Sequence, residues 1–209
     1  MTTVLMRGPK TLRDGIVAYL SVEVPKQIVV ARSQWGLNAQ TLPTPTKYDH
    51  YEPYALDEYP AMGVTVTTAR DFRLNDMDAY AQREYRARYS VRLFTWVRSP
   101  LDTDDVPFEP SYDETVRLRD DMAVVVRSVL LATSSLGSIY LMWDESSLSE
   151  EYSEATAVKG NRFIAGVAHS FDVQVDESLY LPPIGIDNET LIEAMTINEQ
   201  IALVAEEQP

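Results

Sequence analysis

Few side chains in this chain of 209 residues could carry out chemistry. It has no cysteine, which excludes a thiol nucleophile, a disulfide and a zinc site built on cysteine. Its two histidines, His50 and His169, are too few and too far apart for a histidine-based metal site. His169 stands on the apolar face of a predicted strand, so we expect a core or subunit-contact histidine. Spacing alone does not exclude a Ser–His–Asp arrangement.

Clustered carboxylates are the next candidates, because paired Asp and Glu side chains can hold Mg²⁺ or Ca²⁺. The clusters are Asp102 with Asp104 and Asp105, Asp120 with Asp121, and Asp144 with Glu145. The first cluster lacks the glycine and the terminal glutamate of a calcium loop. Neighbours on a helix, such as Asp120 and Asp121, point about 100° apart, which opposes joint chelation. Asp144 and Glu145 follow a predicted strand, as nuclease metal ligands often do, but no matching acid and lysine signature accompanies them.

Loops that cradle phosphate or present a catalytic serine do not occur in the sequence. None of the patterns G-x-x-x-x-G-K-[ST], G-x-G-x-x-G and G-x-S-x-G is found among the eight glycines. We therefore predict no catalytic residue, no cofactor and no metal site. A carboxylate-metal enzyme that uses Asp144 and Glu145 stays open as an alternative, which divalent-metal binding would reveal.

The strongest polar feature is a predicted strand over residues 81–98, in which apolar residues alternate with arginines. One face carries Tyr85, Ala87, Tyr89, Val91, Leu93, Thr95 and Val97, and the other carries Arg86, Arg88, Arg92, Phe94, Trp96 and Arg98. Arginine and tryptophan are frequent anchors of protein interfaces. We predict intersubunit contacts by Arg86, Arg88, Arg92, Trp96 and Arg98, with Asp120 and Asp121 as candidate acidic partners.

Two other interpretations of this face stay open. Phe94 and Trp96 between arginines could form a stacking platform for nucleic acid, or the chain's own helices could cover an ordinary strand face. The charge distribution argues against nucleic acid, because the net charge is −14 and residues 99–209 contribute −17. Arg162 is the last cation in the chain, whereas nucleic-acid affinity depends largely on Lys and Arg.

The elements that position these residues are predicted from periodicity and from helix-capping signals. Thr11 is expected to cap a first helix, and Pro25 to begin a second one that stops at Gly36, so we predict a bent pair of helices. Residues 37–60, with interleaved prolines and tyrosines, are predicted to form an extended connector. The alternation of Met62–Val66 predicts a half-buried strand.

A long amphipathic helix is predicted after an acidic loop at residues 99–110. Ser111 and Glu114 form a capping-box pattern that begins this helix, and Gly137 is expected to mark its end. Beyond it we expect a short strand at residues 139–143, an acidic serine-rich loop at 144–151 and a strand at 163–175.

This order of elements predicts an α+β fold, with a mostly antiparallel sheet packed against a long central helix and N-terminal helices. We predict a single domain over residues 1–180 and an acidic C-terminal extension over residues 181–209. No apolar stretch approaches the ~20 residues that span a bilayer, and no secretory signal is evident. We therefore expect a soluble protein that is made in the cytoplasm and does not contact a membrane.

The pattern resembles tail terminator proteins of long-tailed bacteriophages, which are also called minor tail or neck proteins. The resemblance covers residues 5–178 and rests on the order of the elements. It is carried by the N-terminal helix, the proline-rich connector into Tyr59-Pro60-Ala61-Met62-Gly63-Val64, the strand Tyr85–Val97, the helix Asp120–Leu131, the segment Tyr152–Gly160 and the strand end Phe171-Asp172-Val173-Gln174-Val175.

This resemblance implies a subunit of a hexameric ring on top of the tail tube. The ring stops tube polymerisation and binds the head-completion, or stopper, protein, so the expected partners are other copies, the tail tube protein and the stopper protein. The expected location is the virion, after assembly in the host cytoplasm. DNA would pass non-specifically through the lumen, and an acidic wall formed by part of residues 99–209 would repel it.

Three classes of function therefore stay open. The first is a ring-forming virion component, either the terminator or a neighbouring head–tail connector such as a stopper or adaptor. The second is the carboxylate-metal enzyme. The third is a monomeric adaptor or inhibitor whose acidic surface imitates nucleic acid and binds a basic partner.

Overall fold

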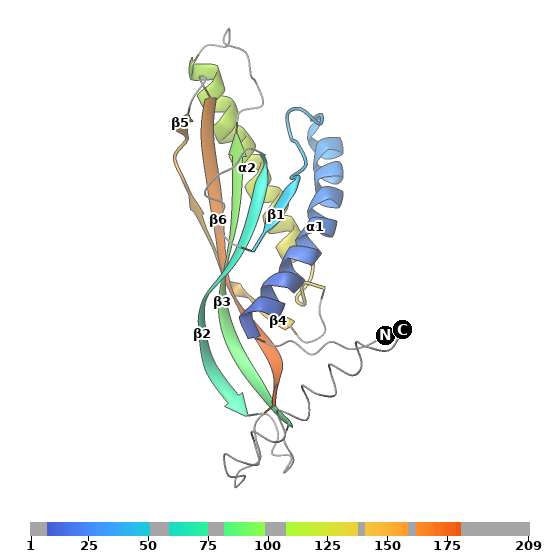
Figure 1. Ribbon diagram of the computed structural model, residues 1–209. Coiled ribbons are helices and arrows are strands. Elements are labelled where there is room, and N and C mark those ends of the chain that lie inside the picture. The colour runs from blue at the N-terminus through green and yellow to red at the C-terminus, as the bar shows by residue number, and fades with distance from the viewer. Residues whose placement is uncertain are drawn as a thin grey trace, which may run out of the picture.

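The computed structural model describes residues 8–50, 59–74, 82–98, 108–137, 141–158 and 162–180 (Figure 1). The elements are α1 (Gly8–Trp35), β1 (Lys47–Asp49), β2 (Ala61–Leu74), β3 (Gln82–Arg98), α2 (Phe108–Leu131), β4 (Leu141–Tyr152), β5 (Thr156–Val158) and β6 (Arg162–Tyr180). The predicted α+β class is confirmed. The C-terminal extension at 181–209 and the loop at 99–107 lie outside the described residues.

The six strands form one mixed sheet in the order β1–β2–β3–β6–β4, and β5 pairs with β6. Only β1 and β2 are parallel, while every other pairing is antiparallel. The parallel pair arises because the predicted connector contributes a three-residue edge strand, Lys47–Asp49. Figure 1 shows β2, β3 and β6 as long twisted strands that run along most of the molecule.

Both helices pack on the same face of the sheet. α1 contacts β1, β2 and α2, while α2 contacts β3 and β6. The expected single long central helix is not found, because α1 has 28 residues and α2 has 24, so two helices of similar length share this face. Their buried side chains form one core with the inward side chains of the sheet, including Leu20, Ile28, Met122, Leu93 and Val173.

The N-terminal segment is one helix that begins at Gly8, so the predicted bent pair of helices with a cap at Thr11 is wrong. Pro25 lies inside α1 rather than at the start of a second helix. Leu20, Val24 and Ile28 are all fully buried, and this continuous apolar stripe offsets the backbone hydrogen bond that Pro25 removes. The helix ends at Trp35, and Gly36 follows with a φ of 67°, as predicted for a helix stop.

The second helix lies slightly earlier in the chain than the capping pattern predicts. α2 begins at Phe108 instead of Ser111, so the expected loop at 99–110 is helical at its end, and Pro110 fits the first turn. The helix ends at Leu131 rather than near Gly137. Gly137, with a φ of 80°, belongs to the turn that follows.

The acidic, serine-rich segment at residues 144–151 is a strand and not the predicted loop. β4 continues through Tyr152, with a register shift between Asp144 and Ser149 where it bulges away from β6. The bulge interrupts the alternation that reveals strands in sequence. By contrast, the strands predicted at 62–66, 81–98 and 163–175 are confirmed as β2, β3 and β6.

Candidate functional site

The candidate site is the face of the sheet that points away from the helices. On β3, Ala87, Val91 and Leu93 are buried in the core, whereas the even-numbered side chains point to the other side, as predicted. We call this surface the arginine face: Arg86, Arg88, Ser90, Arg92, Phe94 and Trp96 of β3, with the neighbouring outward side chains of β6 and β4. No described helix covers it.

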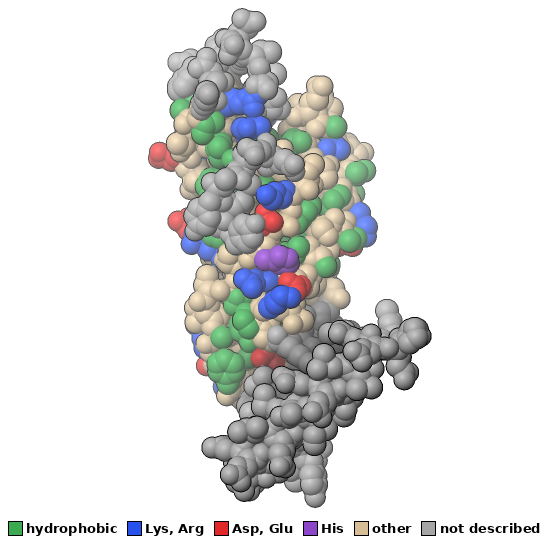
Figure 2. Space-filling model, viewed as in Figure 1, with side chains coloured by type: hydrophobic (Ala, Val, Ile, Leu, Met, Phe, Trp, Pro, Cys, Tyr) green, Lys and Arg blue, Asp and Glu red, His purple; other side chains and the backbone are tan. Residues whose placement is uncertain are grey.

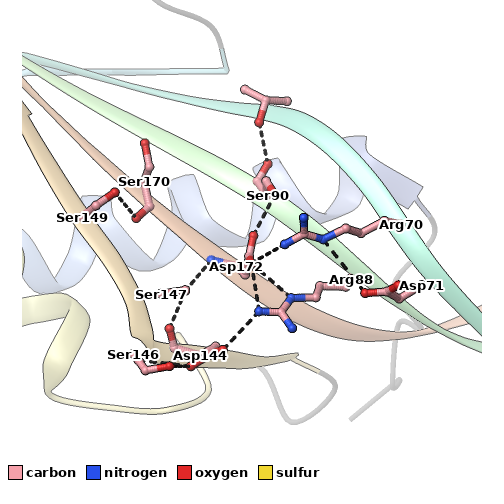
Figure 3. Close-up of polar contacts among 11 residues, drawn as sticks. Arg70, Asp71, Arg88, Ser90, Asp144, Ser146, Ser147, Ser149, Ser170 and Asp172 are labelled. Atoms are coloured by element: carbon pink, nitrogen blue, oxygen red, sulfur yellow. Dashed lines mark hydrogen bonds and ion pairs between the residues drawn. The ribbon is translucent and has the colours of Figure 1, made fainter.

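Asp172 of β6 is the centre of a charged network on this face (Figure 3). Its carboxylate accepts hydrogen bonds from Arg70 of β2 at 2.6 Å, from Ser90 at 2.7 Å and from Arg88 at 3.1 Å. Arg88 also donates to Asp144 of β4 at 3.1 Å. Two aspartates and two arginines therefore tie β2, β3, β6 and β4 together across the sheet.

Both aspartates of this network stay charged well into the acidic range. Burial tends to raise the pKa of Asp172, but the hydrogen bonds from Ser90 and Arg88 and the charge of Arg70 lower it on balance. The pKa of Asp144 is lowered chiefly by the hydrogen bond from the Ser146 hydroxyl. The network is thus two carboxylates held ionised beside two guanidinium groups, which is a structural arrangement rather than an acid–base pair.

Two further arginines on this face have acidic partners within the same chain. Arg86 forms a two-pronged contact with Asp176 of β6, at 2.9 and 3.2 Å. Arg92 bonds Glu151 of β4 at 2.5 Å, and its guanidinium lies 5.0 Å from the centre of the Phe94 ring. Because the Glu151 side chain is 77% exposed, a carboxylate from another molecule could replace it at little cost.

A groove runs beside Arg92, where β6 carries the small residues Gly166 and Ala168. It has a volume of about 190 Å³ and is walled by Phe94, Trp96, Glu151 and Ser153, among others. The six-membered ring of Trp96 lies directly over Gly166, since a Cβ added there would stand only 2.7 Å from Trp96 Cε3. Any other residue at position 166 would displace the indole.

Two residues that line the groove each have a buried hydrogen-bond donor that lacks an acceptor. Within the described residues, neither Trp96 Nε1 nor Arg92 Nε has a hydrogen-bond partner, and both atoms are shielded from solvent. An unsatisfied buried donor costs free energy, which an acceptor from another molecule would recover once the Trp96 or Arg92 side chain shifts to meet it. The groove is therefore the part of the arginine face best suited to contact a second protein surface.

Arg98 lies at the end of β3, apart from the charged network. Its guanidinium stands 4.8 Å from the centre of the Tyr59 ring, and its charge contributes, after burial, to lowering the pKa of Arg162. Two cations and an aromatic ring therefore gather at this end of the sheet. The residues predicted for intersubunit contact on β3 thus share one face, and their contact with a second copy stays a prediction.

The two candidate acidic partners do not share the arginine face. Asp120 and Asp121 belong to α2, which packs on the opposite face of the sheet. Asp120 pairs with its neighbour Arg119 at 2.7 Å. Burial is the main cause that raises the pKa of Asp121, against the charge of Arg117. Within one chain the acids that reach the arginines are instead Asp144, Glu151, Asp172 and Asp176. The sequence suggests acids at 144–154 only as partners from an adjacent copy, and it does not single out Asp172 or Asp176.

The remaining chemical candidates are accounted for by local structure. Asp144, the first of the Asp144–Glu145 pair, is held by Ser146 and Arg88, and the described residues contain no group of three metal-ligating side chains. Asp102, Asp104 and Asp105 lie outside the described residues. His50 is at the surface, with Nδ1 3.3 Å from Asp14. No described helix is long and apolar enough to cross a membrane.

His169 is fully buried between β6 and α2, which confirms the first alternative of the predicted core or subunit-contact histidine. Sequence reasoning missed its neighbours, Glu150 and Tyr152 of β4 and Arg127 of α2, which join it in one polar cluster. No sequence signal marked them, because the bulge in β4 decides that Glu150 points inward.

Figure 2 shows the surface in the same view as Figure 1, with basic and acidic side chains interspersed rather than gathered by sign. Hydrophobic side chains lie along the side occupied by α1, in keeping with the exposed Val22, Val29 and Val30.

Comparison of the chain with protein-family models gives no match, and comparison with curated protein sequences gives none.

Proposed function

We propose that this protein is a structural subunit of the virion of a long-tailed bacteriophage, a tail terminator that forms a hexameric ring at the top of the tail tube. The ring ends polymerisation of the tube and joins the tail to the head-completion, or stopper, protein. Contacts between copies use the arginine face, and DNA passes through the lumen without being bound specifically.

The observation that supports this proposal most directly is the arginine face itself. Its arginines are held in position by ion pairs, and beside them lies a groove with a tryptophan and two donors that lack acceptors in the described chain. Arginine and tryptophan dominate the energetics of protein interfaces when a partner excludes water from them. A preorganised surface of this kind suits docking, because few side chains must be ordered on binding.

The contact between copies is heterologous in this proposal, as ring closure requires. Within the chain, Asp120 and Asp121 stand on the helix side of the sheet and the arginines on the other side. A neighbour related by rotation can therefore bring its α2 acids toward Arg92 and Trp96 of the first copy. In this pairing the neighbour's acids would replace the exposed Glu151 as the partner of Arg92.

The solution mass of the full chain tests the ring directly. We expect light scattering to give about six subunits and negative-stain images to show closed rings. A monomer at every accessible concentration would count against a self-assembling ring. If rings form, binding to the tail tube protein on one side and the stopper protein on the other separates a terminator from a neighbouring stopper or adaptor.

A double variant tests the contact residues. Arg92→Glu with Trp96→Ala should weaken self-association at least about tenfold, because it removes two interface anchors and places an acid beside Glu151. Thermal unfolding would check that the fold persists. Charge reversal at Arg88 is less informative, because it would set Glu beside Asp172 and Asp144 and disturb the fold itself.

The matched control is Lys26→Glu with Trp35→Ala, which makes the same two kinds of change on exposed positions of α1. Its association should equal that of the unmodified chain. Equal association of the arginine-face variant and the control would place the contact between copies elsewhere on the molecule.

A further inference from the structure

The buried cluster around His169 has a geometry that the proposed ring contact does not use. His169 Nε2 lies 3.3 Å from Glu150 Oε1 and 3.4 Å from the Ala123 carbonyl oxygen. Both neighbours are acceptors, so Nε2 is the nitrogen that carries the proton in the neutral imidazole. Nδ1 is buried and has no hydrogen-bond partner in the part of the chain that the structure describes.

Glu150 in turn is held by α2 and by its own strand. Arg127 Nε and Nη2 donate to the two carboxylate oxygens at 2.7 and 2.6 Å, and the Tyr152 hydroxyl donates at 2.6 Å. These contacts keep Glu150 ionised at neutral pH: burial tends to raise its pKa, but the bonds from Arg127 and Tyr152 lower it on balance. At neutral pH the cluster therefore holds one carboxylate, one guanidinium and a neutral histidine.

The stretch of β4 that carries Glu150 lies at the edge of the sheet, where Glu151 also pairs with Arg92 of β3. Residues 149–152 pair with β6 over four positions, from Ser170 to Val167, and the bulge beginning at Asp144 separates them from the rest of β4. On the described chain they have no second neighbouring strand. The cluster of Glu150, Arg127 and His169 is the buried link between this edge segment and α2, and it lies beside the contacts of Arg119 with the Tyr152 ring and the Ser153 carbonyl oxygen.

We propose that this cluster is an acid-sensitive latch, which holds residues 149–152 of β4 onto α2 at neutral pH and releases them when His169 takes up a proton. The added proton must sit on Nδ1, where no acceptor faces it. It would leave two cations, His169 and Arg127, against one carboxylate in a buried site, since Tyr152 is neutral and the facing groups of β3, Leu93 and Thr95, carry no charge.

The burial of His169 also decides in which direction pH changes the opening of the latch. Desolvation, more than the charge of Arg127, lowers the pKa of His169 and outweighs the opposing influence of Glu150. The closed latch therefore binds fewer protons than the open one, so opening becomes easier as the pH falls below the ordinary histidine value of about 6.5. Below the lowered pKa that His169 has in the closed form, the opening of the latch no longer changes with pH. This inference does not depend on the proposed ring.

Hydrogen exchange at the amides of residues 150–152 tests the latch in the full chain. Opening coupled to one proton should raise the opening constant about tenfold per pH unit below pH 6.5, after correction for intrinsic exchange. In His169→Gln, whose amide can donate in place of Nε2 but cannot titrate, this dependence should disappear. The matched control, His50→Gln, alters the other histidine and should keep it.

The chain has only two histidines, so NMR gives a second readout that needs no change at the latch. In His50→Gln every remaining imidazole signal belongs to His169, and its protonation should coincide with the loss of protection at residues 150–152. Protonation of His169 with protection unchanged would overturn the proposal. So would an identical pH dependence of exchange in His169→Gln and the unmodified chain.

Discussion

Trp96 shows how a single contact shapes the candidate interface. Its ring needs the space above Gly166, and Gly166 in turn is anchored by Ser153, whose hydroxyl accepts from the Gly166 amide at 2.8 Å. A glycine in the middle of a long strand normally weakens it. Here the indole covers the exposed backbone, so the pair compensates for the missing side chain.

Gly166→Ala should therefore lower the free energy of unfolding by about 1–3 kcal/mol, because the new Cβ overlaps the indole and the ring must move. Urea unfolding measures the loss, and tryptophan fluorescence should change with it. In the background of Trp96→Leu the same substitution should cost much less, since the obstructing ring is absent. Equal costs in the two backgrounds would show that the contact is not what makes glycine necessary.

At the scale of elements, α1 shows packing overriding local propensity. Proline inside a helix removes one hydrogen bond and clashes with the preceding turn, yet α1 runs through Pro25 from Gly8 to Trp35. The fully buried side chains Ile16, Leu20, Val24 and Ile28 lie on both sides of Pro25 and face the sheet and α2. Their burial in one core keeps both halves of the helix together.

Pro25→Ala should raise the free energy of unfolding by about 2 kcal/mol, which is the helix penalty of proline less its restriction of the unfolded chain. Thermal or urea unfolding of the two proteins measures this change. A decrease in stability would instead mean that the packing of α1 depends on the backbone shape that Pro25 imposes.

β4 is an element that the sequence pattern does not reveal in full. Its N-terminal residues are recognisably apolar, but the bulge between Asp144 and Ser149 shifts the register so that Glu150 faces the core and Glu151 faces Arg92. Glu150 and Glu151, which are neighbours in the chain, thus contact residues on opposite faces of the sheet. A solvated acidic loop has the same composition, so the sequence offers no signal for this strand.

At the scale of the whole molecule, carboxylates linked to arginine join elements that are distant in sequence. Arg88 connects β3 to β6 and β4, and Arg127 connects α2 to β4. The folded state holds the pKa of Asp172, Asp144 and Glu150 below their unfolded values. These groups therefore stabilise the fold when ionised and lose that contribution as the pH falls through their folded-state pKa values.

Stability should accordingly decline in two steps on acidification. The urea midpoint should begin to fall near pH 6.5 because His169 resists protonation, and fall again below about pH 4.5 as the carboxylates protonate. His169→Gln should lack the upper step and keep the lower one. A urea midpoint that stays constant between pH 5 and pH 3 would contradict the role assigned to the paired carboxylates.

The sequence alone determines those features that depend on neighbours along the chain. The alternation in residues 81–98 defines a strand with one core face and one arginine face, and the stripe Leu118, Met122, Val125 and Val129 defines an amphipathic helix, because side-chain direction repeats with backbone period. Composition likewise establishes the acidic C-terminal half and the lack of thiol chemistry.

Only the tertiary structure decides which distant groups meet. Strand order and register bring Arg88 beside Asp144 and Asp172, place Trp96 over Gly166, and put Asp120 and Asp121 on the far side of the sheet from the arginines. They also enclose His169 with Glu150. Such pairings arise from packing of the whole core, whose energy is shared among many contacts, so no local pattern of residues encodes them.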